Sequence, residues 1–197
     1  MAVKLLNKEQ TPEMRQALQR TVMFVTKAHA KQFRKGSGLP YIVHPMAVLS
    51  QVAEWGVTNI AIWNAALCHD VLEDRPDIDT ATLTKIIGRN ATSIVEELTF
   101  IPDPNSEVPR HIQKKAYMES FDQKSIPACV IKWADRICNA FDFLCTDEEY
   151  AKKYWHKADD LFGLLMDRRL EVSQYFEDDS IATHIHYTKS TLGQMMR

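Results

Sequence analysis

The sequence predicts an all-α protein with about eight helices. Apolar residues recur every three or four positions along most of the chain, which is the spacing of a helix face. The 197 residues include only 6 glycines and 8 prolines, fewer turn-forming residues than a strand-rich fold normally needs. This length suits one domain with a sizeable core. We therefore expect residues 1–197 to form a single domain, with a core of about 11–176 and a polar C-terminal tail at 178–197.

The helices expected in the first half of the chain begin at a capping residue or a proline. They cover residues 11–33, 45–56, 60–72, 80–88 and 90–100. The third helix is expected to be capped by Thr58 or Asn59, and the fourth to begin at Asp79 or Thr80. Thr11 and Pro12 are suited to the N-cap and the first helical position of the first helix. Gly36 and Gly38 follow that helix and predict a loop. The segment 60–72 is apolar almost all round, so we expect it to lie at the centre of the fold.

The second half of the chain begins with a loop, because residues 101–109 contain three prolines. Helices are then expected over residues 110–121, 127–144 and 147–176. Pro127 is suited to the first turn of its helix, and Asp147 to the N-cap of the last.

Composition argues against several classes of partner. The net charge of about −2 disfavours nucleic acid and acidic membranes as general partners. The four cysteines form no C-x-x-C pair, so neither a zinc knuckle nor a redox motif is indicated. A basic and apolar leader and a run of eighteen apolar residues are both lacking, which leads us to expect a cytoplasmic protein with reduced thiols.

Two acidic positions stand where a helix core does not favour them. His69 and Asp70 follow the apolar stretch "AIWNAALC", and burying an unpaired carboxylate is costly. Glu73 and Asp74 lie three and four residues later, on the same side of a helix as Asp70. A bound metal ion would relieve this crowding of carboxylates. Exposure of a helix end to solvent would relieve it too, and for this motif alone that is the commoner outcome.

Asp135 likewise lies in an apolar helix, with Lys132 and Asn139 on its face. A buried ion pair with Lys132 or Arg136 explains Asp135 about as well as a metal does.

His44 stands alone near a helix start, where a histidine is more often a core residue than a ligand. Together, however, two histidines and two aspartates make a plausible ligand set, namely His44, His69, Asp70 and Asp135. Mixed nitrogen and oxygen donors suit Mn²⁺, Fe²⁺, Zn²⁺ or Co²⁺ better than Ca²⁺ or Mg²⁺. Spacing alone does not establish that the four residues converge.

Three stretches carry a resemblance to a known family. They are "RKGSGLPYIVHP" at 34–45, "AALCHDVLED" at 65–74 and "IKWADRICNAFDFL" at 131–144. In order and approximate separation they resemble the (p)ppGpp hydrolase domain of Rel/SpoT-type proteins, in the HD metal-dependent phosphohydrolase superfamily. The resemblance covers about residues 15–176. It implies an HD-domain helical bundle, in the manner of a stand-alone small alarmone hydrolase. The implied reaction removes the 3′-pyrophosphate of (p)ppGpp or (p)ppApp.

The resemblance also implies roles for particular residues. The metal ligands, for one Mn²⁺, are His44, His69, Asp70 and Asp135. The catalytic acidic pair is Glu73 and Asp74. The substrate-binding residues are Arg34, Lys35, Asn139 and, across a poorly aligned loop, Lys115. His29 is expected to be structural.

One departure from the family pattern bears on the nucleobase. Relatives usually have a polar residue after the Thr that precedes the proline loop, whereas here Thr99 is followed by Phe100. Rival functions are another HD phosphohydrolase, such as a nucleotidase or NADPH phosphatase, a non-catalytic nucleotide-sensing module, and a helical interaction domain. The "HIH" stretch at 184–186 is expected to be solvated.

The apolar positions Leu161, Leu164 and Leu165 in the last helix suit either the core or a homo-oligomer contact. The oligomeric state is therefore left open by the sequence.

Overall fold

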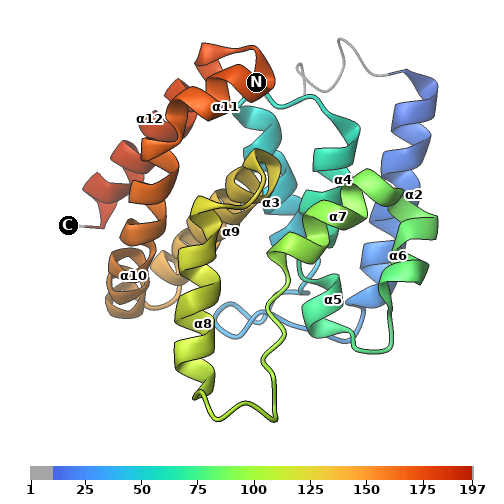
Figure 1. The fold of residues 1–197 in the computed structure, drawn as a ribbon, viewed down its shortest axis with the longest axis horizontal. Coiled ribbons are helices and arrows are strands. Elements are labelled where there is room, and N and C mark those ends of the chain that lie inside the picture. Colours follow the sequence, from blue (N-terminus) through green and yellow to red (C-terminus); the bar gives the residue numbers. More distant parts are fainter. Residues whose placement is uncertain (1–10, 197) are drawn as a thin grey trace.

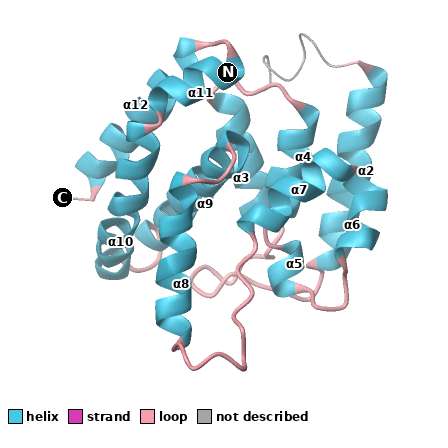
Figure 2. Cartoon of the chain, in the orientation of Figure 1, coloured by secondary structure: helices cyan, strands magenta, loops and turns pink. Residues whose placement is uncertain are grey.

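The computed structural model describes residues 11–196, and this part of the chain is almost entirely helical (Figures 1 and 2). Its elements are α2 (Pro12–Ala28), α3 (Val43–Glu54), α4 (Ile60–Cys68), α5 (Val71–Asp74), α6 (Thr80–Ile87), α7 (Arg89–Leu98), α8 (Arg110–Glu119), the 3₁₀ turn η1 (Ser120–Asp122), α9 (Ile126–Leu144), α10 (Glu148–Asp167), α11 (Arg169–Phe176) and α12 (Asp179–Met195). The predicted all-α fold is confirmed.

Helix starts follow the capping residues that the sequence indicated. The side chains of Thr11, Asn59 and Asp79 each accept a hydrogen bond from a backbone N–H in the first turn of their helix. Each cap satisfies a donor that the helix itself leaves free. Local chemistry therefore fixes where α2, α4 and α6 begin.

The first helix is shorter than expected, because α2 ends at Ala28 rather than near residue 33. The chain then forms a small hairpin-like loop over residues 32–41. Arg34 N–H donates to the Leu39 carbonyl (2.8 Å), and Tyr41 N–H donates to the Gln32 carbonyl (2.9 Å). This loop holds the basic pair of the first motif at a fixed place.

The helix expected over residues 60–72 is broken at the histidine–aspartate pair. α4 ends at Cys68 and α5 begins at Val71, so His69 and Asp70 occupy the junction. Asp70 has φ −100° and ψ −4°, away from regular helix geometry. The junction therefore presents two polar side chains at the end of a buried helix.

The C-terminal region also differs from the expectation. The long helix predicted over 147–176 divides into α10 and α11 at Arg168, whose guanidinium donates to the carbonyls of Phe121 (3.1 Å) and Lys124 (2.7 Å). The segment expected as a polar tail forms α12 and buries Ile181 and Ile185. Periodic apolar residues in an otherwise polar segment explain this packing.

The tail histidine His184 also contacts the fold, because its Nδ1 lies 3.3 Å from the carbonyl of Trp55. Of the three apolar positions noted in the last helix, Leu161 is buried and Leu164 is half-buried. The side chain of Leu165 lies outside the described part.

The core is built around α9, which packs against α3 and α10 (Figure 1). Trp133 of α9 stacks edge-on against Trp55, with ring centroids 6.4 Å apart, and against Phe162, at 4.6 Å. Burial of such large rings supplies a major part of the hydrophobic stabilisation. α9 is therefore a rigid base for any polar group that it carries.

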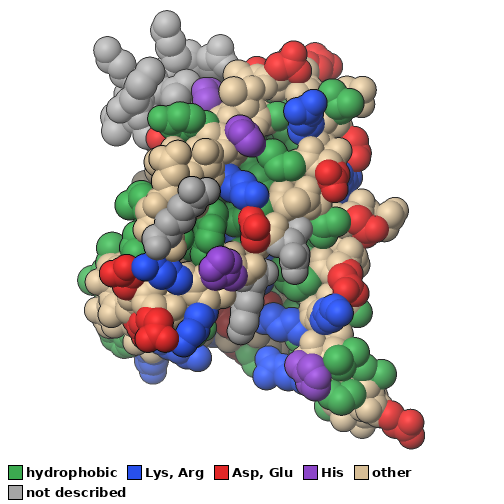
Figure 3. All heavy atoms as spheres, turned by 90° about the vertical axis from the view of Figure 1, so that its left-hand side faces the viewer, with side chains coloured by type: hydrophobic (Ala, Val, Ile, Leu, Met, Phe, Trp, Pro, Cys, Tyr) green, Lys and Arg blue, Asp and Glu red, His purple; other side chains and the backbone are tan. Residues whose placement is uncertain are grey.

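The surface seen in Figure 3 mixes acidic and basic side chains without a large patch of one sign. None of the helices within residues 11–196 combines the length and apolar character needed to cross a lipid bilayer.

Candidate metal centre and adjoining pocket

Four side chains from three parts of the fold converge at one point. His44 lies in the first turn of α3, His69 and Asp70 lie at the α4–α5 junction, and Asp135 lies within α9. The His69 Nε2 to Asp70 Oδ2 distance is 2.9 Å, and the His44 Nε2 to Asp135 Oδ1 distance is 3.2 Å. The two other histidine–aspartate pairings are each 3.8 Å. All four predicted ligand positions are thus brought together.

The donor atoms fit a divalent cation. One atom each of His44, His69 and Asp70 lies within 4.8 Å of the other two, so these three residues could bind a metal ion. His69 Nδ1 lies 2.8 Å from the Ala66 carbonyl, which requires this nitrogen to carry the proton. The lone pair of His69 Nε2 then points inward. This buried nitrogen has no hydrogen-bond partner, since its contact with Asp70 lacks hydrogen-bonding geometry. A cation between His69 Nε2 and the Asp70 carboxylate would give both of these groups a partner.

The electrostatics of the cluster also favour a positive charge at its centre. Burial acts to lower the pKa of His69, but the Asp70 and Asp135 carboxylates outweigh it and raise the pKa to about 9. The carboxylates therefore favour a positive charge between them, and a metal ion binds His69 only in its neutral form.

A second set of groups holds the two carboxylates in position. The Tyr41 hydroxyl donates to Asp70 Oδ2 (2.5 Å), and Asn139 Nδ2 donates to Asp135 Oδ1 (2.6 Å). Lys132 Nζ lies 3.0 Å from Asp135 Oδ2. Burial alone would raise the pKa of Asp135, but Lys132 and the histidines hold it well below its usual range. The ion pair anticipated as an alternative to a metal site is therefore present beside the donor cluster.

A pocket of about 580 Å³ adjoins the cluster on the side of the 32–41 loop. Its polar lining comprises Gln32, Arg34, Lys35, Tyr41, Asp74, Asn139, Asp142, Thr146, Asp147 and Tyr150. Arg34 is fixed there by Asn139 Oδ1 (2.7 Å) and Asp142 Oδ2 (3.0 Å), and its guanidinium carbon lies 5.7 Å from the Tyr41 ring centroid. Basic and aromatic groups together can bind an anion that carries a planar ring.

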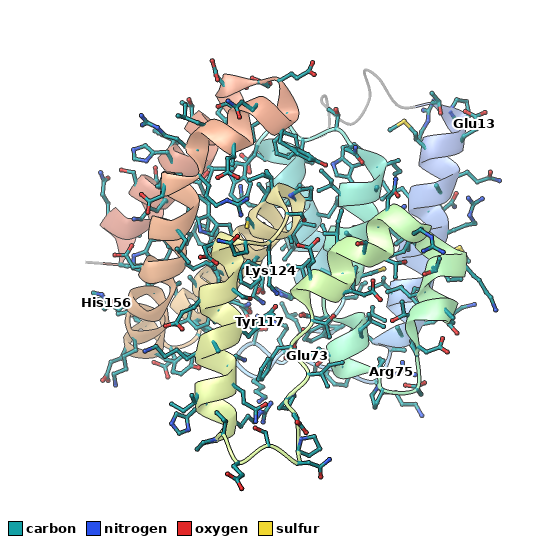
Figure 4. All side chains as sticks on the ribbon, in the orientation of Figure 1. Glu13, Glu73, Arg75, Tyr117, Lys124 and His156 are labelled. Carbon is teal, nitrogen blue, oxygen red and sulfur yellow. The ribbon has the colours of Figure 1, made fainter. Side chains whose placement is uncertain are left out.

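The predicted acidic pair divides between two sides of the site. Asp74 lines the pocket, and burial, followed by the Asp70 carboxylate, raises its pKa. Glu73 instead accepts a hydrogen bond from the Phe100 N–H (3.4 Å). In Figure 4, Glu73 on α5 lies across from Tyr117 on α8, and burial together with the Glu73 charge raises the pKa of Tyr117.

Lys115 does not join the site. Its side chain is 72% exposed and its Nζ lies 3.7 Å from Glu119 on the same helix. The preceding residue, Lys114, is also exposed, but its Nζ lies 5.7 Å from the Phe100 ring centroid. Burial lowers the pKa of Lys114, and the charge of Glu73 opposes this shift. Neighbouring positions on a helix point about 100° apart. An alignment error of one residue across the proline loop is therefore enough to assign the wrong lysine.

Two further positions qualify the sequence analysis. Phe100 is buried against Tyr117, with ring centroids 5.3 Å apart, and does not line the 580 Å³ pocket. His29 is buried beside Tyr41, at a centroid distance of 4.8 Å, and its ring contacts Gln32. Phe100 and His29 therefore pack against Tyr117 and Tyr41, and neither lines the pocket. Tyr41 and Asp142 had no assigned role in the sequence, since only the tertiary fold brings them to the site.

Comparisons with known proteins agree with this geometry. Residues 21–173 match the HD domain family. A human protein named guanosine-3′,5′-bis(diphosphate) 3′-pyrophosphohydrolase MESH1 is 32% identical over 71% of this chain and 75% of its own length. A Synechocystis protein named probable guanosine-3′,5′-bis(diphosphate) 3′-pyrophosphohydrolase is 31% identical over 76% of this chain, which spans only 20% of that longer protein.

A solved structure has the same fold. It is described as a metazoan ortholog of SpoT that hydrolyzes ppGpp and plays a role in starvation responses. It superposes with a TM-score of 0.71 at 21% identity, covering 94% of this chain and 98% of its own. The family match spans most of the chain and includes all four clustered side chains. This chain therefore belongs to the HD domain family.

Proposed function

We propose that this protein is a metal-dependent hydrolase that removes the 3′-pyrophosphate of (p)ppGpp or its adenine counterpart (p)ppApp. The products are pyrophosphate and GDP or GTP, or the adenine equivalents. The observation that carries the proposal is the convergence of two imidazoles and two carboxylates beside a pocket with a fixed arginine. The names of the human and Synechocystis relatives support the guanine form of the reaction. We propose that it acts on this small nucleotide in the cytoplasm.

We propose that His44, His69, Asp70 and Asp135 hold one Mn²⁺. Two nitrogen and two oxygen donors suit this ion, although other transition metals accept the same set. A divalent ion bound there supplies Lewis acidity, which lowers the pKa of water and offsets negative charge on phosphoryl oxygens. Tyr41 and Asn139 keep the two carboxylates oriented through their hydrogen bonds.

The substrate is assigned to the 580 Å³ pocket. Arg34, Lys35 and Asn139 bind its phosphates and sugar, and the flat guanidinium of Arg34 also suits a purine face. On α8 we assign phosphate contact to Lys114 rather than Lys115, because the charge of Glu73 acts on Lys114, whereas Lys115 pairs with Glu119 on its own helix.

Glu73 and Asp74 supply the proton chemistry. A water oxygen attacks the phosphorus bonded to the 3′-oxygen, and that phosphorus–oxygen bond breaks. The 3′-oxygen takes a proton from Asp74 and leaves as a hydroxyl group, and the proton that the attacking water loses restores Asp74. Asp74 suits proton donation because it lines the pocket and its pKa is raised. Glu73 suits orientation of the water, since its carboxylate accepts from a backbone N–H.

The test is incubation of the purified chain with ppGpp, pppGpp and ppApp, each with Mn²⁺, with Mg²⁺ and with a chelator. We expect pyrophosphate release that depends on the metal. Release of orthophosphate identifies a different HD phosphohydrolase and overturns the assigned reaction. Nucleotide binding without turnover identifies a sensing module instead. A parallel assay with Asp70→Ala controls for contaminating activity.

A further inference from the structure

A second pocket, of about 480 Å³, lies among α2, α4, α6 and the start of α7. Its polar groups come from Arg20, Asn64 and the segment 88–91, and its apolar wall includes Ile60 and Ile86. None of these residues lines the pocket beside the metal centre. The proposed hydrolysis gives this second pocket no role.

Asn64 is an unexpected residue in the wall of this pocket. It interrupts the apolar α4 sequence "IAIWNAALC" and is only 5% exposed. Its Oδ1 is fully shielded and has no hydrogen-bond partner, and its side chain makes no hydrogen bond among the described residues. An unsatisfied buried amide costs about 1–3 kcal/mol. Because the unpaired atom is an acceptor, only a ligand that brings a hydroxyl or a protonated phosphate oxygen to it would offset this cost.

The start of α7 adds a set of free backbone donors. Gly88 is the N-cap residue and provides no side-chain cap. The first helical hydrogen bond runs from Thr92 N–H to the Gly88 carbonyl, so the N–H groups of residues 89–91 have no partner within the helix. A side chain at Gly88 would meet no atom within 4 Å, so the backbone is open to close approach by a ligand. Helix N-termini of this kind favour anions.

The charged side chains that line this second pocket are all basic. Arg20 and Arg89 are exposed, and neither forms an ion pair or a side-chain hydrogen bond within residues 11–196. No acidic side chain of the described residues lines the pocket. Two unpaired guanidiniums therefore stand beside the free N–H groups and the buried amide. Guanidinium and backbone N–H groups are the donors that bind phosphate most strongly in proteins.

We propose that this pocket binds the phosphate group of a small phosphorylated molecule. The N–H groups of residues 89–91 and the two arginines bind the phosphate oxygens. The amide of Asn64 turns toward the pocket, and its Oδ1 accepts from a hydroxyl of the ligand or from a protonated phosphate oxygen. Ile60 and Ile86 provide an apolar surface for its non-phosphate portion. This inference is independent of the reaction proposed for the metal centre.

The test is a titration of the full-length, Mg²⁺-loaded protein with inorganic phosphate, followed by backbone and side-chain amide NMR. Chloride at matched ionic strength serves as the reference. We expect saturable shifts at the amides of residues 89–91 and at the Asn64 side chain. The double variant Arg20→Ala/Arg89→Ala should bind phosphate at least roughly tenfold more weakly. Arg15→Ala is the matched control, because Arg15 is also exposed on α2 but lies outside the pocket.

Three results would overturn the proposal. They are shifts that do not saturate, shifts spread over basic residues across the whole surface, and equal affinity in the double variant. Asn64→Asp gives a further check, because a carboxylate at the buried wall should abolish binding. If Asn64→Asp does not fold, Arg20→Glu tests the same repulsion from the surface. The double variant should keep its turnover of ppGpp, so loss of phosphate binding and failure of the proposed hydrolysis are separate results.

Discussion

The two halves of the candidate site are built in different ways. On the metal side, His44, His69 and Asp135 are 4%, 2% and 5% exposed and lie within or at the ends of core helices. On the pocket side, Lys35 is exposed, and the basic residues come from a loop. The donor cluster is thus part of the hydrophobic core, whereas the pocket is part of the surface.

This difference indicates that the buried cluster and the exposed pocket have separate tasks. α9 carries Asp135 on the same helix as Trp133, so the packing that stabilises the fold also fixes the donor atoms. The 32–41 loop is held by few backbone hydrogen bonds and by the contacts of Arg34 with α9. We therefore expect substitutions in the core to change turnover, and substitutions in the 32–41 loop to change substrate binding.

The sharpest test of this division is Asp70→Ala. We expect bound metal and pyrophosphate release both to fall below detection, because the cluster loses the carboxylate that faces both histidines. Metal content by elemental analysis and a turnover assay measure the two effects. Asp77→Ala is the matched control, since Asp77 pairs only with the exposed side of Arg75. Normal turnover by a metal-free Asp70→Ala protein would contradict the assignment of the metal centre.

The acidic pair should separate chemistry from metal binding. Asp74→Asn and Glu73→Gln should both retain the metal while turnover falls roughly 10²- to 10⁴-fold, the range for loss of a general acid or base. Asp74→Asn should have the larger effect, because only Asp74 lines the pocket. Metal content and initial rates are measured on the same samples. If Glu73→Gln loses its metal, Glu73 belongs to the donor set.

Much of the fold was predictable because helices depend on local sequence. Apolar periodicity and the caps Thr11, Asn59 and Asp79 place the helix starts correctly. Two breaks were missed for different reasons. The α4–α5 junction contains neither glycine nor proline, so the sequence gives no stop signal there. The α10–α11 break depends on Arg168 reaching carbonyls more than forty residues away.

The site was predictable only where residue type itself carries the signal. Buried histidines and aspartates stand out in apolar segments, and all four converge. The contact between Arg34 and Asn139, 105 residues apart, leaves no trace in local spacing. The same holds for the hydrogen bond from Tyr41 to Asp70. Lys114 and Lys115 are chemically identical, so only the rotation of α8 decides which one the charge of Glu73 influences.

On the pocket side, Arg34→Lys tests whether the loop governs substrate binding. Lysine keeps the charge but loses the forked contact with Asn139 and Asp142. We expect KM for ppGpp to rise roughly tenfold, with metal content unchanged and kcat within a few-fold of the parent. Arg169→Lys, at an exposed position on α11, provides the control. A loss of bound metal would show that the pocket and the cluster are not separate.

Tyr41 lies where the two halves meet, and its substitution should give the smallest effect on turnover at saturating Mn²⁺. Its hydroxyl donates to Asp70 in the cluster, whereas its ring faces Arg34 in the pocket. Tyr41→Phe keeps the ring and removes only the hydrogen bond behind a candidate ligand. Loss of such a bond weakens metal affinity by about tenfold or somewhat more. We therefore expect half-maximal activation to need more Mn²⁺, while KM for ppGpp at saturating Mn²⁺ stays unchanged. A changed KM with unaltered Mn²⁺ dependence would instead assign the hydroxyl to the pocket, and the boundary between the buried and exposed halves would then lie at Asp70 itself.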